Sequence, residues 1–365
     1  MTAWVKGAPA DLATAVRAAA DLLAGARTPV VTGLNAELAA VRAAYRLADA
    51  LGASVDPLAS DSLYAELAPL SAYGVMTTTP VETLGRADVV LTVGARPWDD
   101  AYTAELARTT PTRGRAAGGP RTILALGGPD GPGRTTCGLG NAGLPAAVGQ
   151  LRAIVKGHLG GDGPEADIVR RLAAARYGVV IYEPAELGGL GVEMLQGLIK
   201  DLNETTRVFG LPMADPYQGR SVLQLSAWTT GQAPRTGFGR GLPEHDPWRF
   251  DGARQVAAGE ADAALWVASL PSPRPDWLGT VRSVAVVGEG SPEAAGETAE
   301  VVIAVGVPGE GVGGTLWHDR RGVVAYVEGA APGGGAAAAA VLADIHAHLR
   351  LPRPDSRPDR KDASC

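Results

Sequence analysis

The sequence predicts an α/β fold of two packed domains, each built around a doubly wound parallel sheet. Short apolar runs end at a glycine or a polar turn and are followed by apolar residues at helical spacing. This strand–glycine–helix order recurs along the chain, as is typical of parallel α/β units. With 365 residues, 46% of them hydrophobic, the chain can bury a large core.

The first third of the chain is expected to alternate helices and strands. Leu12, Val16 and Leu23 recur at helical spacing, and the apolar run TPVVT ends at Gly33. Thr79 is a good N-cap, with proline at the first helical position after it. The expected helices are 8–24, 36–51, 63–70, 79–86 and one through Arg108, and the expected strands are 28–32, 54–55, 87–93 and 122–126.

The same alternation continues after a glycine-rich segment, 127–143, that has no element period. The expected helices are 144–156, 165–175, 190–202, 251–258 and 335–349, and the expected strands are 178–182, 207–209, 263–268, 281–287, 300–305 and 323–327. Residues 308–317 are again rich in glycine. The tail 350–365 has proline and charge without an apolar period, so we expect disorder there.

These elements are assigned to two domains and two shorter pieces. The first domain is expected to be discontinuous, with residues 1–57 and 165–300, and the second, 58–160, to be inserted into it. Residues 301–349 should add a short β and loop segment and an alanine-rich helix.

Composition excludes several classes of protein. A net charge of −6 and a pI near 5.5 argue against nucleic-acid binding. Two cysteines are too few for a disulfide framework or a multi-cysteine metal site. No run of about 18 apolar residues and no secretory signal pattern is found, so we expect a soluble cytoplasmic protein without membrane contact.

The segment 229–250 is the strongest candidate for a binding loop. Glycines and prolines alternate there with aromatic residues and no simple period is present, and long irregular loops in compact domains are often functional. Trp228, Trp248 and Phe250 are expected either to stack on a planar ligand or to lock the loop to the core. His245 with Asp246 is either functional or a loop cap.

Other candidate groups are weaker. The glycine-rich segment 127–143 could wrap an anion with its amides, although such loops often bind nothing. Cys137 is interpreted as an inert thiol. His318 with Asp319 is either an acid–base pair or a turn. His346 and His348, two apart on a helix, are interpreted as surface residues. No phosphate-binding GxxxxGK[ST], HExxH, CxxC or GxSxG motif is present.

The loop carries a family resemblance. TTGQAPRTGFGRGLPEHDP, preceded by DLNETTR and followed by GEADAALWVASLPSP, resembles the B subunit of formylmethanofuran dehydrogenases, in the molybdopterin oxidoreductase superfamily. GRADVVLTVGARP and AEVVIAVGVPGEGVGGTLWHD agree in order and spacing. The resemblance spans roughly residues 11–329 and implies the molybdopterin oxidoreductase fold.

The sequence departs from the redox-active members of that family. They hold an iron–sulfur centre with an N-terminal cysteine cluster, whereas residues 1–10 contain no cysteine. Their metal-binding Cys-His should fall near residues 57–62, which read PLASDS. A dithiolene-bound metal needs a soft or anionic protein ligand, and Asp61 could in principle serve. The resemblance therefore implies no cofactor, because the molybdopterin and iron–sulfur ligands are missing, and leaves Asp61, Arg235, Arg240 and His245 as remnants of a site.

The pattern is similar to a bacterial branch of the family, the beta subunit of a formyltransferase/hydrolase complex in tetrahydromethanopterin-linked formaldehyde oxidation. That likeness implies a non-catalytic, redox-dead structural subunit. Its implied partners are an amidohydrolase-like subunit, a formyltransferase subunit and a further subunit. Two alternatives stay open. One is an active molybdopterin-dependent dehydrogenase with Asp61 or Ser60 on the metal. The other is a binding module that holds a pterin or an anionic carrier tail near Arg235, Arg240 and residues 127–143.

Overall fold

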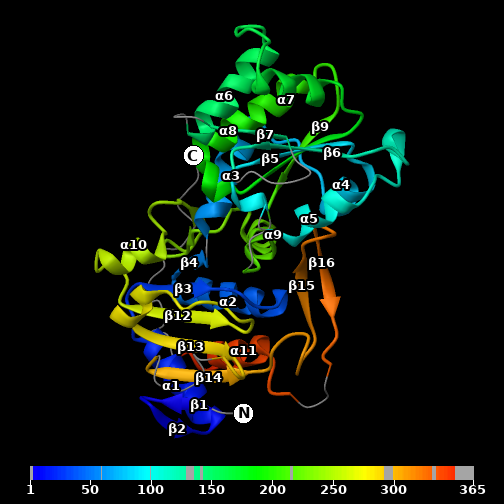
Figure 1. Ribbon diagram of the computed structural model, residues 1–365. Coiled ribbons are helices and arrows are strands. Elements are labelled where there is room, and N and C mark those ends of the chain that lie inside the picture. Colours follow the sequence, from blue (N-terminus) through cyan, green and yellow to red (C-terminus); the bar gives the residue numbers. More distant parts are fainter. Residues whose placement is uncertain are drawn as a thin grey trace, which may run out of the picture. The chain divides into compact units, whose positions relative to one another are not determined.

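The computed structural model describes residues 3–58, 60–98, 100–128, 135–139, 143–213, 217–291, 299–330 and 334–349 (Figure 1). The chain divides by its internal contacts into two units. The first comprises Met1–Leu58, Tyr217–Leu316 and Ala325–Cys365, and the second comprises Ala59–Pro216 and Trp317–Val324. Both are mixed α/β units with parallel strands at their centres, as the sequence predicts.

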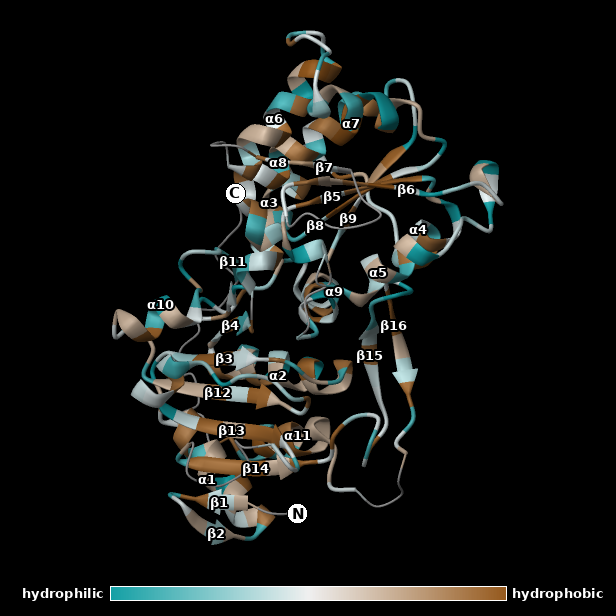
Figure 2. Ribbon diagram, in the orientation of Figure 1, coloured by the Kyte–Doolittle hydropathy of each residue, from teal (hydrophilic) through white to brown (hydrophobic). Residues whose placement is uncertain are grey.

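The first unit is built on a nine-stranded sheet in the order β11-β10-β4-β3-β12-β13-β14-β1-β2. Its five central strands are parallel: β4 (Ser54–Pro57), β3 (Pro29–Gly33), β12 (Ala263–Ala268), β13 (Arg282–Gly288) and β14 (Val301–Val305). The outer strands are antiparallel: β1 (Ala3–Val5), β2 (Ala8–Ala10), β10 (Thr236–Gly237) and β11 (Glu244–His245). Figure 2 shows hydrophobic colouring along β13 and β14, as expected for strands buried on both faces.

Helices cover both faces of this sheet. One face packs against α1 (Leu12–Ala24), α2 (Leu38–Leu51) and α11 (Ala338–His348), around a core that includes Leu23, Leu47 and Leu265. The other face packs around the buried Trp266 and is met by α10 (Gly252–Ala257). The helix α9 (Gly219–Thr230) contacts α2.

The second unit is built on a wholly parallel sheet in the order β7-β6-β5-β8-β9. Its strands are β5 (Val89–Val93), β6 (Thr122–Leu126), β7 (Thr135–Cys137), β8 (Gly178–Tyr182) and β9 (Val208–Pro212). Its helices are α3 (Ser60–Tyr73), α4 (Pro80–Arg86), α5 (Ala101–Arg108), α6 (Leu144–Val155), α7 (Pro164–Ala173) and α8 (Pro184–Leu202). A separate two-stranded sheet pairs β15 (Gly314–His318) with β16 (Val323–Val327).

The chain returns from the second domain to the first at a different residue from the one that we expected. We expected the chain to return to the first domain at residue 165. Instead, β8 pairs with β5 and β9 pairs with β8 in the sheet of the second unit, and the chain returns near Tyr217. Residues 301–349 do not form a separate piece, because β14 and α11 belong to the first unit. Buried strands look alike in sequence, so their apolar runs do not indicate which sheet they join.

Several elements also differ from the sequence expectation. The helix expected from residue 8 begins at Leu12, after β2, because Asp11 caps it by accepting a hydrogen bond from the Thr14 N–H at 2.8 Å. The helix expected from residue 190 begins at Pro184 and breaks at Gly188, which has φ of 67°. The segment 308–317 contains most of β15. The expected disordered tail, 350–365, lies outside the described residues.

Candidate functional site

The carboxyl ends of parallel strands are the usual ligand-binding edge of an α/β sheet. In the second unit this edge holds a small anion-binding turn after β5. Gly94, with φ of 90°, turns the chain so that the N–H groups of Ala95 and Arg96 point together. Both bind the Glu186 carboxylate, at 2.8 and 3.2 Å. A side chain at position 94 would clash with that carboxylate. The chain therefore fills its own anion site with Glu186.

The segment that stands where the resemblance places a metal ligand lies at the start of α3. Ser60 is buried, and Asp61 is an exposed residue of the first helical turn. The Ser62 hydroxyl donates to Glu183 Oε1 at 2.5 Å, and Glu183 also caps α8. The segment thus serves to join α3 to the carboxyl end of β8.

The corresponding edge of the first unit is also occupied, here by Glu37, which follows β3. Glu37 is only 3% exposed. Its carboxylate accepts hydrogen bonds from the Ser269 hydroxyl at 3.0 Å and from the Ala339 N–H at 3.3 Å. Burial raises the pKa of this carboxyl, and the hydrogen bonds only partly oppose that rise. Glu37 connects β3, β12 and α11 inside the unit.

A glycine cluster lies farther along the same edge. A Cβ at Gly306 or Gly334 would clash with backbone of the opposite segment, so the two segments pack backbone against backbone. A cavity of about 330 Å³ opens beside them, lined by Gly306 and Gly311 and by the carboxylates of Glu289 and Glu310. Two carboxylates repel the pyrophosphate of a pterin dinucleotide, so the described residues at this edge do not fit that cofactor.

The loop at 229–250 is anchored by Arg235, whose side chain is 10% exposed. Its guanidinium binds Asp56 Oδ1 at 3.1 Å, Asp251 Oδ2 at 2.8 Å and the Pro247 carbonyl at 2.8 Å. The other Asp56 oxygen accepts from the Gly252 N–H at 2.8 Å. Arg235 is therefore a structural clamp inside the first unit, and these contacts use its hydrogen-bonding capacity within the protein.

The aromatic residues in and beside the loop differ in their environment. Phe238 packs edge-on against Tyr45 in the core, and Phe250 lies directly under Gly237. These two residues lock the loop to the sheet. Trp228 is 63% exposed and Trp248 is 70% exposed.

Arg240 and His245 lie on the outside of the loop. The Arg240 side chain is 68% exposed and pairs with Glu244 at 3.0 Å, and His245 is exposed. The N–H groups of Arg249 and Trp248 donate to Asp246, and the Arg249 N–H is the main cause of its lowered pKa. Asp246 is therefore a loop cap, one of the two interpretations open for it.

A cavity of about 440 Å³ lies between this loop and the amino ends of β3 and β4. Its charged lining groups are Arg240, Glu244, Arg249 and Glu260. Each has an oppositely charged neighbour within 4 Å: Glu244 pairs with both arginines, and Glu260 pairs with Arg254 at 2.7 Å. The cavity thus offers balanced charge rather than an open anion site.

The remaining candidates do not assemble into a centre. Burial raises the pKa of Cys137 to about 11, which makes its thiol a poor nucleophile at neutral pH. His346 and His348 are exposed on α11, as expected, and His318 lies in β15.

Within the described ranges, no three His, Cys, Asp or Glu residues are grouped so that they could hold a metal ion. No helix in the described part of the chain is long and apolar enough to cross a membrane. Of the segment 127–143, residues 129–134 and 140–142 lie outside the described residues.

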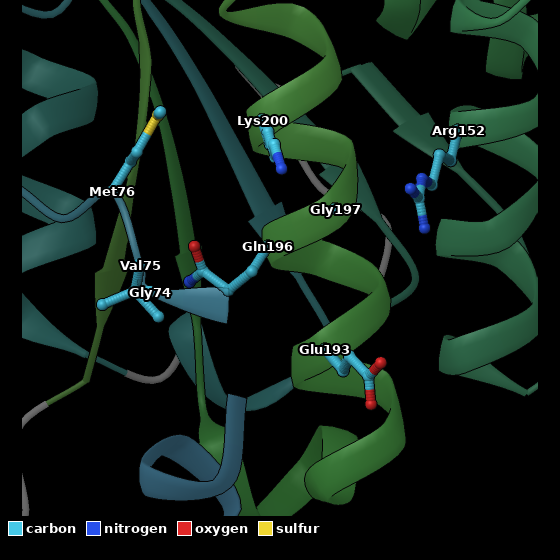
Figure 3. Close-up of a pocket in the computed structure, with 8 residues that line it drawn as sticks. All are labelled: Gly74, Val75, Met76, Arg152, Glu193, Gln196, Gly197 and Lys200. Atoms are coloured by element: carbon cyan, nitrogen blue, oxygen red, sulfur yellow. The ribbon is translucent and has the colours of Figure 1, made fainter. Parts of the chain in front are cut away.

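The second unit also has a cavity of about 540 Å³ beside α8 (Figure 3). Figure 3 shows Gln196 extending from α8 toward Val75 and Met76. The Gln196 Nε2 donates to the Tyr182 hydroxyl at 3.1 Å, and Arg152 on its margin pairs with Asp201 at 2.7 Å. Its polar and charged lining residues are Arg152, Glu193, Gln196 and Lys200, so it offers hydrogen bonds and ionic contacts.

The four sequence-derived site residues are divided between the two units. Arg235, Arg240 and His245 belong to the first unit, and Asp61 belongs to the second. Sequence reasoning missed Glu37 and Glu186. Each glutamate follows a buried strand by a few residues, and this position could have marked it as a candidate. The groups that bind the two carboxylates come from distant segments, so sequence alone did not reveal the contacts.

Comparisons with known proteins identify relatives that the chain resembles over most of its length. No protein-family model matches it. The B subunit of the formyltransferase/hydrolase complex Fhc of Methylorubrum extorquens is 63% identical over 334 residues, which cover 91% of this chain and 92% of that protein. The B subunit of the tungsten-containing formylmethanofuran dehydrogenase 2 of Methanocaldococcus jannaschii is 28% identical over 294 residues, 72% of this chain and 65% of that protein.

A solved structure agrees with these relatives. The crystal structure of the formyltransferase/hydrolase complex FhcABCD from Methylorubrum extorquens, in complex with methylofuran, contains a chain that matches this one with a TM-score of 0.93. The two chains are 62% identical, and the match covers 95% of this chain and 98% of that chain.

Proposed function

The chain belongs to the B-subunit family of the formyltransferase/hydrolase complex, and on that basis we propose that it is a redox-inactive structural subunit of such a complex. The membership confirms the resemblance recognised in the sequence. The distant relation to the B subunit of formylmethanofuran dehydrogenase marks the ancestry.

The observation that carries the proposal is the segment at residues 57–62. The resemblance puts a metal-binding Cys-His there, and this chain has PLASDS. Ser62 binds Glu183, and Asp61 lies on an exposed helical turn. The segment thus offers an exposed carboxylate, and a Ser62 hydroxyl already bound to Glu183, where the family has a soft thiolate or selenolate ligand.

The carboxyl edges of both sheets support the same proposal. A pterin dinucleotide needs free amide or cationic donors for its phosphates. In the second unit the amides after β5 are bound by Glu186, and in the first unit the edge presents Glu289 and Glu310. The described residues therefore do not fit a bis-pterin metal centre.

The finer assignments belong to the same proposal. We assign the fold to the doubly wound molybdopterin oxidoreductase type, because both sheets have parallel centres covered by helices on two faces. The proposed partners are an amidohydrolase-like subunit, a formyltransferase subunit and a further subunit, and the proposed location is the cytoplasm. The chain would support a complex of one-carbon metabolism without contributing catalytic residues.

Metal and pterin analysis of the native complex tests the proposal. The complex is purified without a tag, its subunits are identified by mass spectrometry, and molybdenum, tungsten and oxidatively released pterin are measured per copy of this chain. We expect the chain to co-purify with the other subunits and to carry far less than one molybdenum, tungsten or pterin. Stoichiometric metal together with pterin would refute the redox-inactive role.

A further inference from the structure

The amino edge of the sheet in the second unit carries an arginine cluster. Parallel strands bring their first residues together, and arginines stand just before four of them: Arg86 before β5, Arg121 before β6, Arg176 before β8 and Arg207 before β9. The register confirms the proximity, because Gly178 of β8 pairs with both Val89 and Val208. Positive charge therefore lies at the amino edge of this sheet, whereas most ligands of α/β proteins bind at the carboxyl edge.

Arg121 has a structural role in this group. Its guanidinium donates to the carbonyl oxygens of Leu84, Ala87 and Leu106 at 2.6–2.9 Å, and to Thr109. Burial lowers its pKa. These bonds hold α4 and α5 against the sheet. One of the four arginines, Arg121, therefore has a structural role.

The other three arginines, with Arg115 from the turn before β6, surround a cavity of about 550 Å³. Arg86 pairs with Glu82 of its own helix at 2.6 Å. Arg115, Arg176 and Arg207 have no carboxylate within 4 Å among the described residues; the nearby Asp88 accepts from the backbone N–H groups of Arg176 and Tyr177. Three exposed guanidinium groups in a chain of net charge −6 therefore lack local counter-charges.

We propose that this cavity, which we name the arginine cavity, binds a small ligand with two or more adjacent oxyanions, carboxylates or phosphates. A guanidinium donates two parallel N–H bonds to such groups and keeps its charge at any physiological pH. A volume of about 550 Å³ lies within the roughly 300–1,000 Å³ range of small-molecule sites. The hydroxyl of Thr206, which lines the cavity, already donates to the Ala175 carbonyl. We therefore expect the arginines to donate the hydrogen bonds that bind the ligand.

Calorimetric titration of the full chain with inorganic pyrophosphate, and separately with tricarballylate, tests the proposal. The Arg115→Ala/Arg207→Ala variant removes two lining charges without removing an ion pair. The Arg170→Ala/Arg171→Ala variant is the matched control, since it removes the same charge from exposed residues of α7 that pair with Asp167 outside the cavity. Circular dichroism checks that both variants fold.

We expect saturable binding to the wild type and the control, with binding to the cavity variant at least about tenfold weaker, as loss of a charge-assisted hydrogen bond implies. Binding should weaken with added NaCl. Pyrophosphate binding alone would identify a phosphorylated ligand, and binding of both anions a ligand class that includes polycarboxylates. No saturable binding of either anion, or equal loss in the two double variants, would refute the proposal.

Discussion

Arg235 and Arg240 lie five residues apart in one loop, and their side chains have opposite environments. Arg235 is buried between Asp56 and Asp251, whereas Arg240 is exposed and pairs only with Glu244 among the ion pairs of the described chain. Both matched the family loop in sequence, so sequence could not separate the clamp from the surface residue. Burial, which depends on the distant Asp56, does separate them.

We expect Arg235→Ala to lower the free energy of unfolding by about 3–5 kcal/mol, because it leaves two carboxylates in a poorly hydrated site without their cation. Arg240→Ala, the matched control, should change it by less than about 1 kcal/mol, since exposed ion pairs contribute little. Urea unfolding followed by tryptophan fluorescence measures both. Equal effects would mean that Arg235 is not a buried clamp.

Glu37 predicts a pH dependence of stability. Its pKa is raised in the folded state by burial. A carboxyl with a raised folded pKa holds its proton longer in the folded chain than in the unfolded chain. Its contribution is therefore greatest at acid pH and is lost as the pH rises from the unfolded pKa of about 4.3 through the raised folded value.

Glu37→Gln removes this titration and keeps an acceptor for the Ala339 N–H, while its amide nitrogen can donate to the Ser269 hydroxyl in place of the bond that Ser269 donates to Glu37. The difference in unfolding free energy between Glu37→Gln and the wild type should therefore grow in favour of the variant between pH 4 and pH 7. Urea unfolding at several pH values in that window measures it. A difference independent of pH would contradict the raised pKa.

At the scale of elements, close packing explains why the loop has a fixed shape. Gly237 in β10 pairs with Ser54 and lies against the ring of Phe250, and a Cβ there would overlap that ring. Gly239, two residues on, has only the Gly52 carbonyl oxygen near its Cβ position, at 3.6 Å. The two glycines thus form a matched pair for testing the packing.

Gly237→Ala should destabilise the chain by about 1–3 kcal/mol, the usual range for overpacking in a well-packed site. Gly239→Ala should stay within about 0.5 kcal/mol, as is usual for a change away from special structural features. Thermal unfolding of both variants under the same conditions gives the comparison. A similar melting temperature for the two variants would show that Phe250 moves aside freely.

The sequence predicted elements well where local signals suffice. The strands β6, β8, β12 and β16 have the expected bounds, and α4 begins after its Thr79 cap, as expected. The sequence failed where distant contacts decide. The run at residues 8–10 favours helix by composition, yet it forms β2 because β1 lies beside it. The same reason explains why Glu186 was missed, since its role is visible only once β5 and α8 are together.

At the scale of the whole molecule, both units keep the frame of a ligand-binding α/β protein while its own carboxylates occupy the ligand edges. Glu186 in one unit and Glu37 in the other bind backbone amides of their own unit. These interactions stabilise each frame from within. Under the proposed structural role, the chain contributes to a complex through its surface, and the exposed aromatic residues of the loop lie there.

The last prediction concerns that surface and rests on the proposed assembly role. Trp248 and Leu242 are 70% and 62% exposed in the chain by itself. Large exposed apolar side chains in one loop are typical of protein interfaces, so we expect another component of the formyltransferase/hydrolase complex to cover them.

Hydrogen–deuterium exchange of residues 239–250 should be slower in the complex than in the free chain, with β12 equally protected in both. Leu242→Ser/Trp248→Ser should weaken assembly and lower the stability of the free chain by no more than about 1 kcal/mol, the contribution of the Arg254 guanidinium that lies 4.3 Å from the Trp248 ring. Leu159→Ser, at a position that is 50% exposed in the second unit, serves as the control. Unchanged exchange in the loop, together with normal assembly of the double variant, would place the interface elsewhere.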